Sequence, residues 1–262
     1  MSEGKNVIEV KNLRAVVHEE GQDITLLHDS SFVVREGESL GILGESGSGK
    51  STTGRVLAGL LKPDSGAVLI EGEDVYAGSK GREHLRNRLS IVFQDYTTSA
   101  NPRFTIRRVI GEGIAVGARK TGEKIDYAEE TARLLRLVGL DESFAKRFPH
   151  ELSGGQLQRV CIARAIACRS ELILFDEAVS SLDAHTQVQI MDLLLDLKEK
   201  LGLTYIFITH DLTSITYFCS RVIFLKDGSV VADSSVSELS KLDVPYAKEL
   251  LGAVLDFNAE SA

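Results

Sequence analysis

The sequence predicts an α/β fold, in which a largely parallel sheet carries helices on both faces. Short apolar runs typical of buried strands, such as Leu172–Phe175 and Thr204–Ile208, alternate with segments of helical periodicity. Another such run, Ser39–Leu43, ends abruptly in glycines and leads directly into a helical stretch. From Asp95 to Pro149 the strand signals fade, which indicates a helical segment inserted into the alternation.

Length and composition are those of a soluble globular chain with room for a full core. The 262 residues could form one large domain or one domain with an insertion. The charged fraction of 26% and the hydrophobic fraction of 43% are ordinary for globular proteins. The formal net charge of −8 argues against nucleic acid as the main partner, because phosphate backbones are bound by clustered excess lysine and arginine.

The sequence carries no signal for export or membrane insertion. No run of about 18 uncharged apolar residues occurs, so we expect no membrane-spanning helix. Met1–Lys5 lacks the basic-then-apolar pattern of a signal peptide. The three cysteines, Cys161, Cys168 and Cys219, are typical of buried thiols in a reducing compartment rather than of a disulfide framework. We therefore expect a cytosolic protein.

The first part of the chain is interpreted as strands around one helix. Lys50–Leu61 has helical spacing and is stopped by Pro63 and the Ser65-Gly66 turn. Ser30–Val34 leads into a turn at Arg35-Glu36-Gly37-Glu38. Further strand-like segments are Val7–Val17, Ala67–Gly72 and Leu89–Phe93.

In the second part, helices come first and strands return later. Tyr127–Val138 has helical spacing, with charges of both signs on its other face. The helix-like segment Ala184–Lys200 separates the two strands Leu172–Phe175 and Thr204–Ile208. Two final strands, Arg221–Leu225 and Ser229–Ala232, are joined by Lys226-Asp227-Gly228, which predicts a hairpin.

A phosphate-binding loop is predicted at Gly44-Glu45-Ser46-Gly47-Ser48-Gly49-Lys50-Ser51, which fits the pattern G-x-x-x-x-G-K-[ST] between a strand and a helix. Glycines let the backbone wrap closely, so that several N–H groups and the positive end of the helix face the phosphates. Lys50 can reach the β and γ phosphates, and the Ser51 hydroxyl can ligate Mg²⁺. The structural alternative, a glycine-rich turn that binds no ligand, does not account for the position of this segment between a strand and a helix.

A pair of acids follows a second apolar strand, in Leu172-Ile173-Leu174-Phe175-Asp176-Glu177. In a parallel sheet with a phosphate-binding loop, this strand delivers Asp176 to the Mg²⁺ site at its carboxyl end. Glu177 is placed to orient or polarise an attacking water. An acidic pair that merely opens a loop is common alone, but it is a poor explanation beside such a loop.

A second phosphate-binding device is predicted at Leu152-Ser153-Gly154-Gly155-Gln156, which runs straight into the helical stretch Leu157–Cys168. Two glycines and a serine at a helix N-terminus again expose backbone N–H groups. A single bound ATP is not expected to use two such phosphate-binding helix N-termini of the same subunit. We infer that this second loop covers the ATP of a partner chain.

These residues resemble the ABC ATPase family, whose signature is LSGGQ and whose nucleotides lie between two subunits. The resemblance covers roughly residues 6–251, and the motifs occur in the family's order. It implies an α/β fold with a P-loop NTPase (RecA-like) core, an N-terminal antiparallel β subdomain and an inserted α-helical subdomain. The implied division is an ATP-binding core at 1–94 and 158–235, a helical subdomain with the signature loop at 95–157, and a short C-terminal segment at 236–262.

Further positions match the family one by one. Gln94 resembles the Q-loop glutamine, Ser181-Leu182-Asp183 resembles the D-loop at the subunit interface, and His210 resembles the switch histidine that contacts the γ-phosphate. The resemblance therefore implies ATP and Mg as ligands, with Glu177, His210 and Gln94 as catalytic residues. The implied nucleotide contacts are Gly44, Glu45, Ser46, Gly47, Ser48, Gly49, Lys50, Ser51, Thr52, Asp176, Ser153, Gly154, Gly155, Gln156 and Asp183, and the implied Mg ligands are Ser51 and Gln94, with Asp176 in support.

One position departs from the family pattern. Members usually stack an aromatic residue from the first strand region on adenine, and the matching position here is Val17, followed by His18. Valine offers apolar contact without ring stacking, so we expect either modest nucleotide affinity or stacking by His18.

Several segments resemble the peptide/nickel importer branch, and nickel-type importer ATPases most closely. They are Val92-Phe93-Gln94-Asp95 with Asn101-Pro102-Arg103, the signature helix Leu152–Ala167, Asp176-Glu177-Ala178-Val179-Ser180, and Pro245–Leu251. Longer members carry a C-terminal cysteine cluster for iron–sulfur binding. This chain has no cysteine after Cys219, so no cluster is expected, and Cys161 and Cys168 are interpreted as core packing.

The branch implies a multi-subunit importer for peptides, nickel or metal-chelate complexes. Its parts are a second ATPase chain, expected to be a non-identical paralogue, two membrane permeases, and an extracytoplasmic binding protein that acts indirectly; nucleic acid is not expected. The chain would lie peripherally on the cytoplasmic face of the inner membrane. The segment Asp95–Phe104 and the helical subdomain would receive the permeases, with an ordinary exposed loop as the alternative.

Two other functions remain open at this stage. An exporter ATPase shares the same motifs, although the Asn101-Pro102-Arg103 segment and Pro245–Leu251 favour an importer. A non-transport ABC protein acting on ribosomes or DNA usually carries two ATPase cassettes or a long coiled coil, and neither is found in this sequence.

Overall fold

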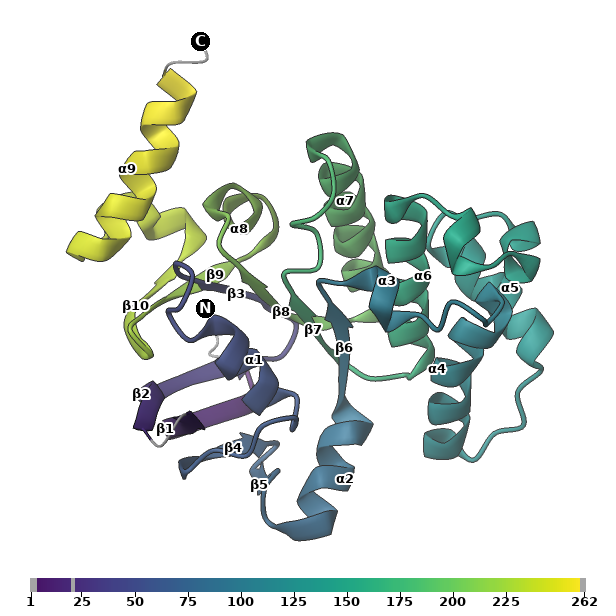
Figure 1. Ribbon diagram of the computed structural model, residues 1–262, viewed down its shortest axis with the longest axis horizontal. Coiled ribbons are helices and arrows are strands. Elements are labelled where there is room, and N and C mark those ends of the chain that lie inside the picture. The colour runs from purple at the N-terminus through teal and green to yellow at the C-terminus, as the bar shows by residue number, and fades with distance from the viewer. Residues whose placement is uncertain (1–3, 20–21, 260–262) are drawn as a thin grey trace. The chain divides into compact units, whose positions relative to one another are not determined.

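The computed structural model describes residues 4–19 and 22–259, which form two compact units (Figure 1). The first unit comprises the chain up to Arg86 together with the chain from Thr204 onward. The second unit is Asn87–Leu203. Each unit has its own strands and helices, and each is considered by itself below.

An antiparallel sheet in the first unit contains the strands β1 (Asn6–Glu19), β2 (Gln22–Arg35), β4 (Ser65–Ile70) and β5 (Glu73–Asp74), in the order β2-β1-β4-β5. Apolar side chains alternate along β1 and are buried at Ile8 and Val10. This sheet confirms the expected N-terminal antiparallel β subdomain. The sequence indicated only the end of β2, because the apolar residues in its first part, Ile24, Leu26 and Leu27, do not alternate with polar ones.

The parallel part of the first unit is built on β3 (Ser39–Leu43), which pairs in parallel with β8 (Thr204–Thr209) on one side and β9 (Arg221–Lys226) on the other. Every residue of β3 and β8 is buried, which explains their uninterrupted apolar sequences. β10 (Ser229–Ser235) pairs antiparallel with β9, so the predicted hairpin is confirmed. The helical elements of this part are α1 (Lys50–Leu57), α2 (Gly78–Arg88), α8 (Leu212–Phe218), η3 (Val236–Lys241) and α9 (Pro245–Ala259).

Helix α1 ends at Leu57, four residues before the expected end at Leu61. Gly59 adopts a left-handed conformation with φ 71°. The N–H of Gly59 bonds to the carbonyl of Val56, and the N–H of Leu60 bonds to the carbonyl of Arg55. This pair of bonds is a Schellman motif, which stops the helix before the chain reaches Pro63.

The second unit contains two parallel strands, β6 (Leu89–Phe93) and β7 (Leu172–Asp176), and a helical bundle. Its helices are α3 (Tyr96–Ser99), α4 (Ile106–Thr121), α5 (Tyr127–Leu137), η1 (Glu142–Lys146), η2 (Pro149–Glu151), α6 (Gly154–Ala167) and α7 (Ala184–Leu201). α4 lies directly on α6, because a Cβ at Gly113 would fall 2.9 Å from that of Ala167. These helices confirm the expected inserted α-helical subdomain.

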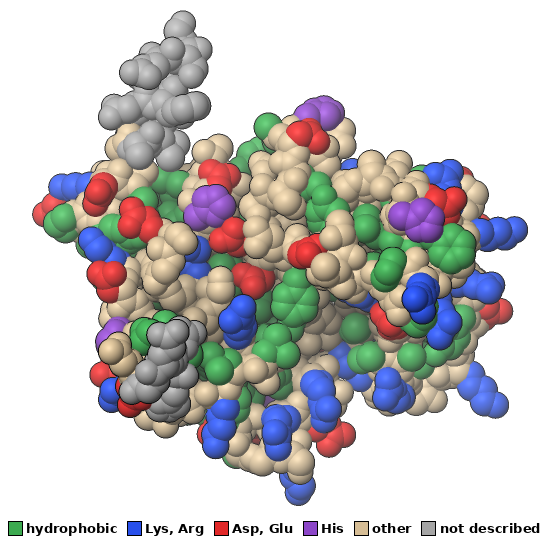
Figure 2. Space-filling model, in the orientation of Figure 1, with side chains coloured by type: hydrophobic (Ala, Val, Ile, Leu, Met, Phe, Trp, Pro, Cys, Tyr) green, Lys and Arg blue, Asp and Glu red, His purple; other side chains and the backbone are tan. Residues whose placement is uncertain are grey.

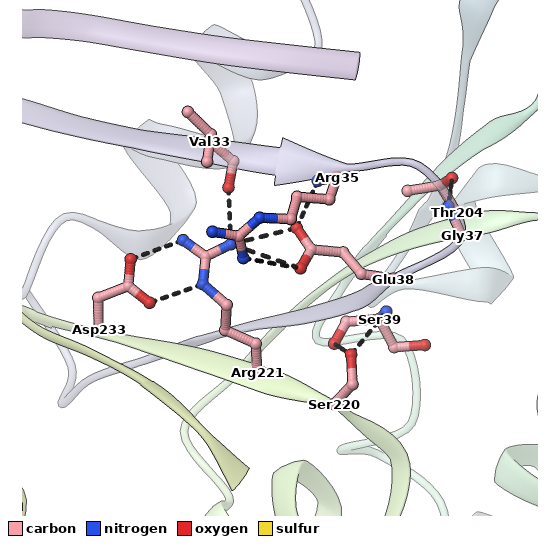
Figure 3. A network of polar contacts seen from close by, with 9 residues as sticks. All are labelled: Val33, Arg35, Gly37, Glu38, Ser39, Thr204, Ser220, Arg221 and Asp233. Carbon is pink, nitrogen blue, oxygen red and sulfur yellow. Dashed lines mark hydrogen bonds and ion pairs between the residues drawn. The ribbon is translucent and has the colours of Figure 1, made fainter. Parts of the chain in front are cut away.

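A polar network around Arg221 links the two sheets of the first unit (Figure 3). The Arg221 guanidinium, 8% exposed, forms two bonds to the Asp233 carboxylate on β10, of 2.7 and 2.6 Å. Its third nitrogen donates to the carbonyl of Val33 on β2 at 2.9 Å and to Glu38 at 3.2 Å. Burial lowers the pKa of Arg221, but Asp233 and Glu38 outweigh this effect and raise it. Arg221 therefore stays charged and joins β2 to the β9–β10 hairpin.

The surface of α2 is strongly basic, and Figure 2 shows Lys and Arg side chains over this helix at the lower edge of the view. Only Gly81 and Leu85 of α2 are buried. This explains why no apolar periodicity revealed the helix in the sequence. Among the described residues, no helix is long and apolar enough to cross a membrane.

The boundaries of the two compact units fall after Arg86 and after Leu203. The functional division expected from the sequence, at residues 94, 157 and 235, uses different boundaries and stays a prediction. Both divisions place the helices α3 to α5 outside the part that carries the phosphate-binding loop.

Candidate nucleotide site

The expected site residues form two groups, one in each unit. In the first unit, Leu43 at the end of β3 pairs with Thr209 at the end of β8. Gly44 and His210 follow these two residues, so the phosphate-binding loop and the histidine leave the same edge of the sheet on neighbouring strands. This is the edge at which open α/β sheets bind their ligands.

The loop between β3 and α1 is wound around the ammonium group of Lys50. The Lys50 side chain is 5% exposed, and its Nζ donates to the carbonyl oxygens of Gly44 at 2.6 Å and Glu45 at 2.7 Å. Gly47 and Gly49 have φ of 82° and 100°, a backbone region that residues with a Cβ rarely adopt. The two glycines therefore allow a tight loop with a lysine inside it.

The chemistry of this loop fits the phosphate groups of a nucleotide. α1 begins at Lys50 with Gly49 as its N-cap, so no side chain caps the N–H groups of its first turn. The Ser48 hydroxyl is buried and has no hydrogen-bond partner among the described residues. Ser51 is exposed, and Thr52 is buried. Amides without a side-chain cap, a helix dipole and a lysine together favour an anion.

In the second unit, a second group of residues lies at the ends of β6 and β7. Phe93 pairs with Asp176, so Gln94 and Glu177 follow neighbouring strands at one edge. The Gln94 Nε2 donates to the Ser180 Oγ at 3.2 Å, and this hydroxyl donates to the Glu177 carbonyl at 2.9 Å. The structure thus brings Gln94, Asp176 and Glu177 together, with Ser180 linking the first and the last.

The backbone of Glu177 is strained, with φ 48°. A non-glycine residue in the left-handed region typically costs about 1–2 kcal/mol. The bonds from the N–H and hydroxyl of Ser180 to the Glu177 carbonyl hold this conformation. Such strain is kept where a side chain must point in a required direction, as in active sites.

The signature loop forms the N-terminus of α6. The Ser153 hydroxyl accepts from the Gln156 N–H, and the Gln156 side chain accepts from the Ser153 N–H, so the two form a capping box. A Cβ at Gly154 would fall 2.5 Å from the Tyr96 hydroxyl, and one at Gly155 would fall 2.5 Å from Thr186 Cγ2. A side chain at either position would therefore have to displace the Tyr96 or Thr186 side chain, which approaches the backbone closely.

The D-loop aspartate caps the next helix. The Asp183 side chain accepts from the Thr186 N–H at 3.0 Å and from the Thr186 hydroxyl at 2.7 Å. These hydrogen bonds lower the pKa of Asp183. The side chain is thus held within its own chain, at the start of α7.

A Mg²⁺ ion would be held mainly by phosphate oxygens. Among the described residues, no group of three or more His, Cys, Asp or Glu side chains could hold a metal ion by itself. The expected ligands Ser51, Gln94 and Asp176 offer hydroxyl, amide and carboxylate oxygens, which suit this hard cation. Each of these side chains by itself therefore has the chemistry to contact a metal that arrives with a nucleotide.

Two other expectations concern single positions. Val17 lies on β1 opposite Ile24 and is half-buried, while the His18 side chain lies outside the side chains that the structure describes.

Cys161 is 3% exposed, and burial raises the pKa of its thiol to about 11. Its interpretation as core packing is confirmed, because a thiol in this environment stays protonated. Cys168 is only half-buried.

Sequence reasoning missed several residues that contact the phosphate-binding loop from the C-terminal part of the chain. The Glu45 N–H donates to the Tyr246 hydroxyl at 3.1 Å, and the Gly228 N–H donates to the Ser48 carbonyl at 2.9 Å. In the sequence, Tyr246 stands out only as part of the Pro245–Leu251 resemblance. No spacing rule connects residues this far apart in sequence, so the pattern gave no signal of the contact.

Comparisons with known proteins agree with the geometry. The ABC transporter family matches residues 27–180. The nickel import ATP-binding protein NikE of Rhodospirillum rubrum is 41% identical over 235 residues, covering 88% of this chain and 83% of that protein. The oligopeptide transport ATP-binding protein OppF of Bacillus subtilis is 39% identical over 256 residues, covering 95% of this chain and 83% of that protein.

Among solved structures, the chain is similar to the dimeric ATP-binding cassette MJ0796 in a post-hydrolysis state bound to ADP and Pi. The TM-score is 0.77 at 31% identity, over 87% of this chain and 98% of that one. The match supports the α/β fold with its P-loop core. The chain therefore belongs to the ABC transporter family, as one of its ATPase chains.

Proposed function

We propose that this chain is the ATP-binding and ATP-hydrolysing subunit of an importer, which powers the uptake of peptides, nickel or metal-chelate complexes through partner permeases. The observation that carries the proposal is that one chain has two helices that begin at glycine-containing segments, a position that suits phosphate. One is α1 behind Gly44–Ser51, and the other is α6 behind Ser153.

The two helix N-termini contact two different ATP molecules. Gly44–Ser51 and Thr52 bind the phosphates of this chain's own ATP, with Lys50 on the β and γ phosphates. Ser153–Gln156 cover the ATP held by a second ATPase chain, whose own signature loop covers this one. The structure of MJ0796 is described as dimeric, which supports a reaction chamber shared by two chains.

Hydrolysis depends on positioning and electrostatic stabilisation. Glu177 orients the attacking water, and its position directly after β7, linked to Gln94 through Ser180, supports such a role. His210 stabilises the γ-phosphate, and Gln94 contacts the water or the metal. Ser51 and Gln94, with Asp176 in support, would hold Mg²⁺, which would supply positive charge against the phosphates.

The remaining subunits supply the membrane pathway. Two permeases, and through them an extracytoplasmic binding protein, complete the importer, and the chain lies on the cytoplasmic face of the membrane. The names of the relatives support the importer branch, since one is a nickel import protein and another an oligopeptide transport protein. The second ATPase is a non-identical paralogue.

The substitution Glu177→Gln tests this function in the assembled transporter. It keeps the size and most hydrogen bonds of the side chain but removes the charge that orients the water. We expect MgATP binding within about twofold of wild type and turnover reduced at least 100-fold, in line with the loss of a group that acts in the transition state. ATP binding and phosphate release are the measurements.

Glu83→Gln on the exposed face of α2 provides a matched control that removes the same charge elsewhere. This control should bind and hydrolyse ATP like wild type. Turnover of Glu177→Gln close to that of wild type would remove Glu177 from the mechanism. Co-purification of the chain with permeases of an exporter would overturn the importer assignment.

A further inference from the structure

The backbone of Glu45 holds a central position in the phosphate-binding loop. Its carbonyl accepts from the Lys50 ammonium at 2.7 Å and from the Ser48 N–H at 3.2 Å. Its N–H points the other way, toward the C-terminal helix α9, and donates to the Tyr246 hydroxyl at 3.1 Å. A shift of Glu45 would therefore move the lysine that is placed for the β and γ phosphates.

Tyr246 is itself firmly held. It is the second residue of α9, directly after Pro245, and it is 5% exposed. The Lys226 ammonium lies 4.7 Å from the centre of its ring, which is a favourable cation–π distance. Ala247, the next residue, is fully buried, and α9 packs against α8. The hydroxyl thus has little freedom to leave the loop.

The turn after β9 holds the other end of the same loop. The Gly228 N–H donates to the Ser48 carbonyl at 2.9 Å, two residues before Lys50. Lys226, which contacts the Tyr246 ring, begins this turn. Tyr246, Lys226 and Gly228 therefore form one connected support, which we call the C-terminal brace, and it contacts the loop at Glu45 and at Ser48.

The alternative explanation is that Tyr246 only fills the core, because a buried tyrosine usually finds some hydrogen-bond partner for its hydroxyl. Tyr246 differs from such a core residue in the partner that its hydroxyl has. Its hydroxyl bonds to a main-chain amide inside the phosphate-binding loop, 201 residues away in sequence, rather than to a neighbouring turn or to solvent. Burial raises the pKa of Tyr246, so the hydroxyl stays neutral and can accept from this amide.

We propose that Tyr246 is a positioning residue of the nucleotide site, which sets the affinity for the triphosphate by fixing the Glu45 backbone. The inference rests on the proposed binding of ATP at Gly44–Ser51 and adds the C-terminal helix to that site. The hydroxyl contacts the Glu45 backbone rather than Glu177, His210 or Gln94, so we expect it to act on binding rather than on the chemical step.

Tyr246→Phe in the full-length chain tests the proposal, since it removes the hydroxyl and keeps the ring on Lys226. A lost hydrogen bond of this kind changes an equilibrium by roughly three- to tenfold. We expect the Kd for MgATP, and the KM of the assembled transporter, to rise by about this factor, while kcat changes less than twofold. Titration with MgATP and steady-state hydrolysis give the two readings.

Tyr76→Phe is the matched control. The Tyr76 hydroxyl lies 2.6 Å and 2.7 Å from the carbonyl oxygens of Val56 and Leu61, at the far end of α1 from the phosphate-binding loop. Its removal should lower the Tm but leave the Kd for MgATP unchanged. This control separates loss of stability from loss of loop positioning.

Three results would count against the inference in different ways. If Tyr246→Phe binds MgATP as tightly as wild type, Tyr246 is structural only. If Tyr76→Phe weakens binding to the same degree, the effect is general destabilisation, and the proposal is overturned. If the wild-type chain does not bind MgATP at all, the proposed function fails, and the inference fails with it.

Discussion

At the scale of single residues, the structure places several polar groups where the core offers them no partner. Gln158 is the clearest case, since its side chain is fully buried and neither its Nε2 nor its Oε1 finds a hydrogen-bond partner in the described part of the chain. Burying an amide without partners typically costs about 1–3 kcal/mol. The signature helix α6 thus carries a destabilising residue in its first half.

Replacing Gln158 by Leu should therefore stabilise the protein. The side chains are similar in volume, and the unsatisfied amide is removed, so we expect the free energy of unfolding to rise by about 1 kcal/mol. Urea denaturation of the purified chain measures this value. Gln189→Leu, at an exposed position on α7, should change it by less than about 0.5 kcal/mol. A loss of stability in Gln158→Leu would mean that the amide has an important partner.

Individual motif residues could be predicted from the sequence because their chemistry is local. The glycines around Lys50, the acids after Phe175 and the glycines after Ser153 are each set by a few neighbouring residues. Long-range contacts could not be predicted in this way. Tyr246 on Glu45 is one example, and Ser180 between Gln94 and Glu177 is another. Such contacts follow only from the folded backbone.

At the scale of elements, aspartates repeatedly start helices. Asp95, Asp126, Asp183 and Asp211 each accept hydrogen bonds from N–H groups of the helix that follows. For Asp95, bonds to Thr97 and Thr98 hold the pKa at about 2. The bonds to Thr186 also lower the pKa of Asp183, and a carboxylate at this end of a helix interacts favourably with the helix dipole. The caps at Asp95 and Asp183 therefore weaken in acid.

The cap of α7 gives a pH-dependent prediction. The pKa of Asp183 is lower in the folded protein than in the unfolded chain, so its contribution is complete above the unfolded pKa of about 4. It is lost as the pH falls through the lower folded value. Asp183→Ala should therefore lower the Tm at pH 7, and the difference from wild type should shrink below about pH 4.

Asp183→Asn keeps an oxygen that can accept from the Thr186 N–H but does not titrate. This variant should lie close to wild type at pH 7 and lose less of its stability in acid, as followed by thermal unfolding from pH 2 to pH 7. An Asp183→Ala difference that stays constant across this range would show that the cap does not depend on the charge.

Elements with a strong pattern were predicted almost to the residue. The strands 39–43 and 89–93 agree with β3 and β6, and the helix expected at 127–138 ends one residue earlier in the structure. β2 and α2 were incompletely predicted or missed, because exposed polar residues fill much of β2 and almost all of α2. For such elements, pairing and packing decide the structure rather than periodicity.

At the scale of the whole molecule, the sequence predicted the fold class, the N-terminal β subdomain and the inserted helical subdomain, but not the polar contacts that connect the parts of the first unit. Arg221 links the β9–β10 hairpin to β2, and it does so through a carboxylate from another strand and a main-chain carbonyl. The sequence around an arginine at the start of an apolar strand gives no pattern from which these hydrogen-bond partners could be predicted. The core composition was predictable, whereas this polar connection was not.

Arg221→Ala should destabilise the protein strongly. The change leaves the Glu38 carboxylate, 10% exposed, without the guanidinium, and it leaves the Val33 carbonyl without its donor. Removing one partner of a buried ion pair typically costs about 3 kcal/mol or more. Lys200→Ala, which breaks the exposed pair with Asp196 on α7, should cost about 0.5 kcal/mol or less. Chemical denaturation compares the two, and equal losses would contradict a special role for Arg221.

The glycines of α4 have a mechanical consequence for the signature helix. Gly113 and Gly117 meet α6 and the chain just after it at Arg164, Ala167 and Arg169, which is the end of that helix farthest from Ser153. A Cβ at Gly113 would fall 2.2 Å from the Arg164 carbonyl oxygen, and one at Gly117 would fall 2.4 Å from the Ala167 carbonyl oxygen. A larger residue at either position would therefore push α4 away from α6, the helix that begins next to Ser153.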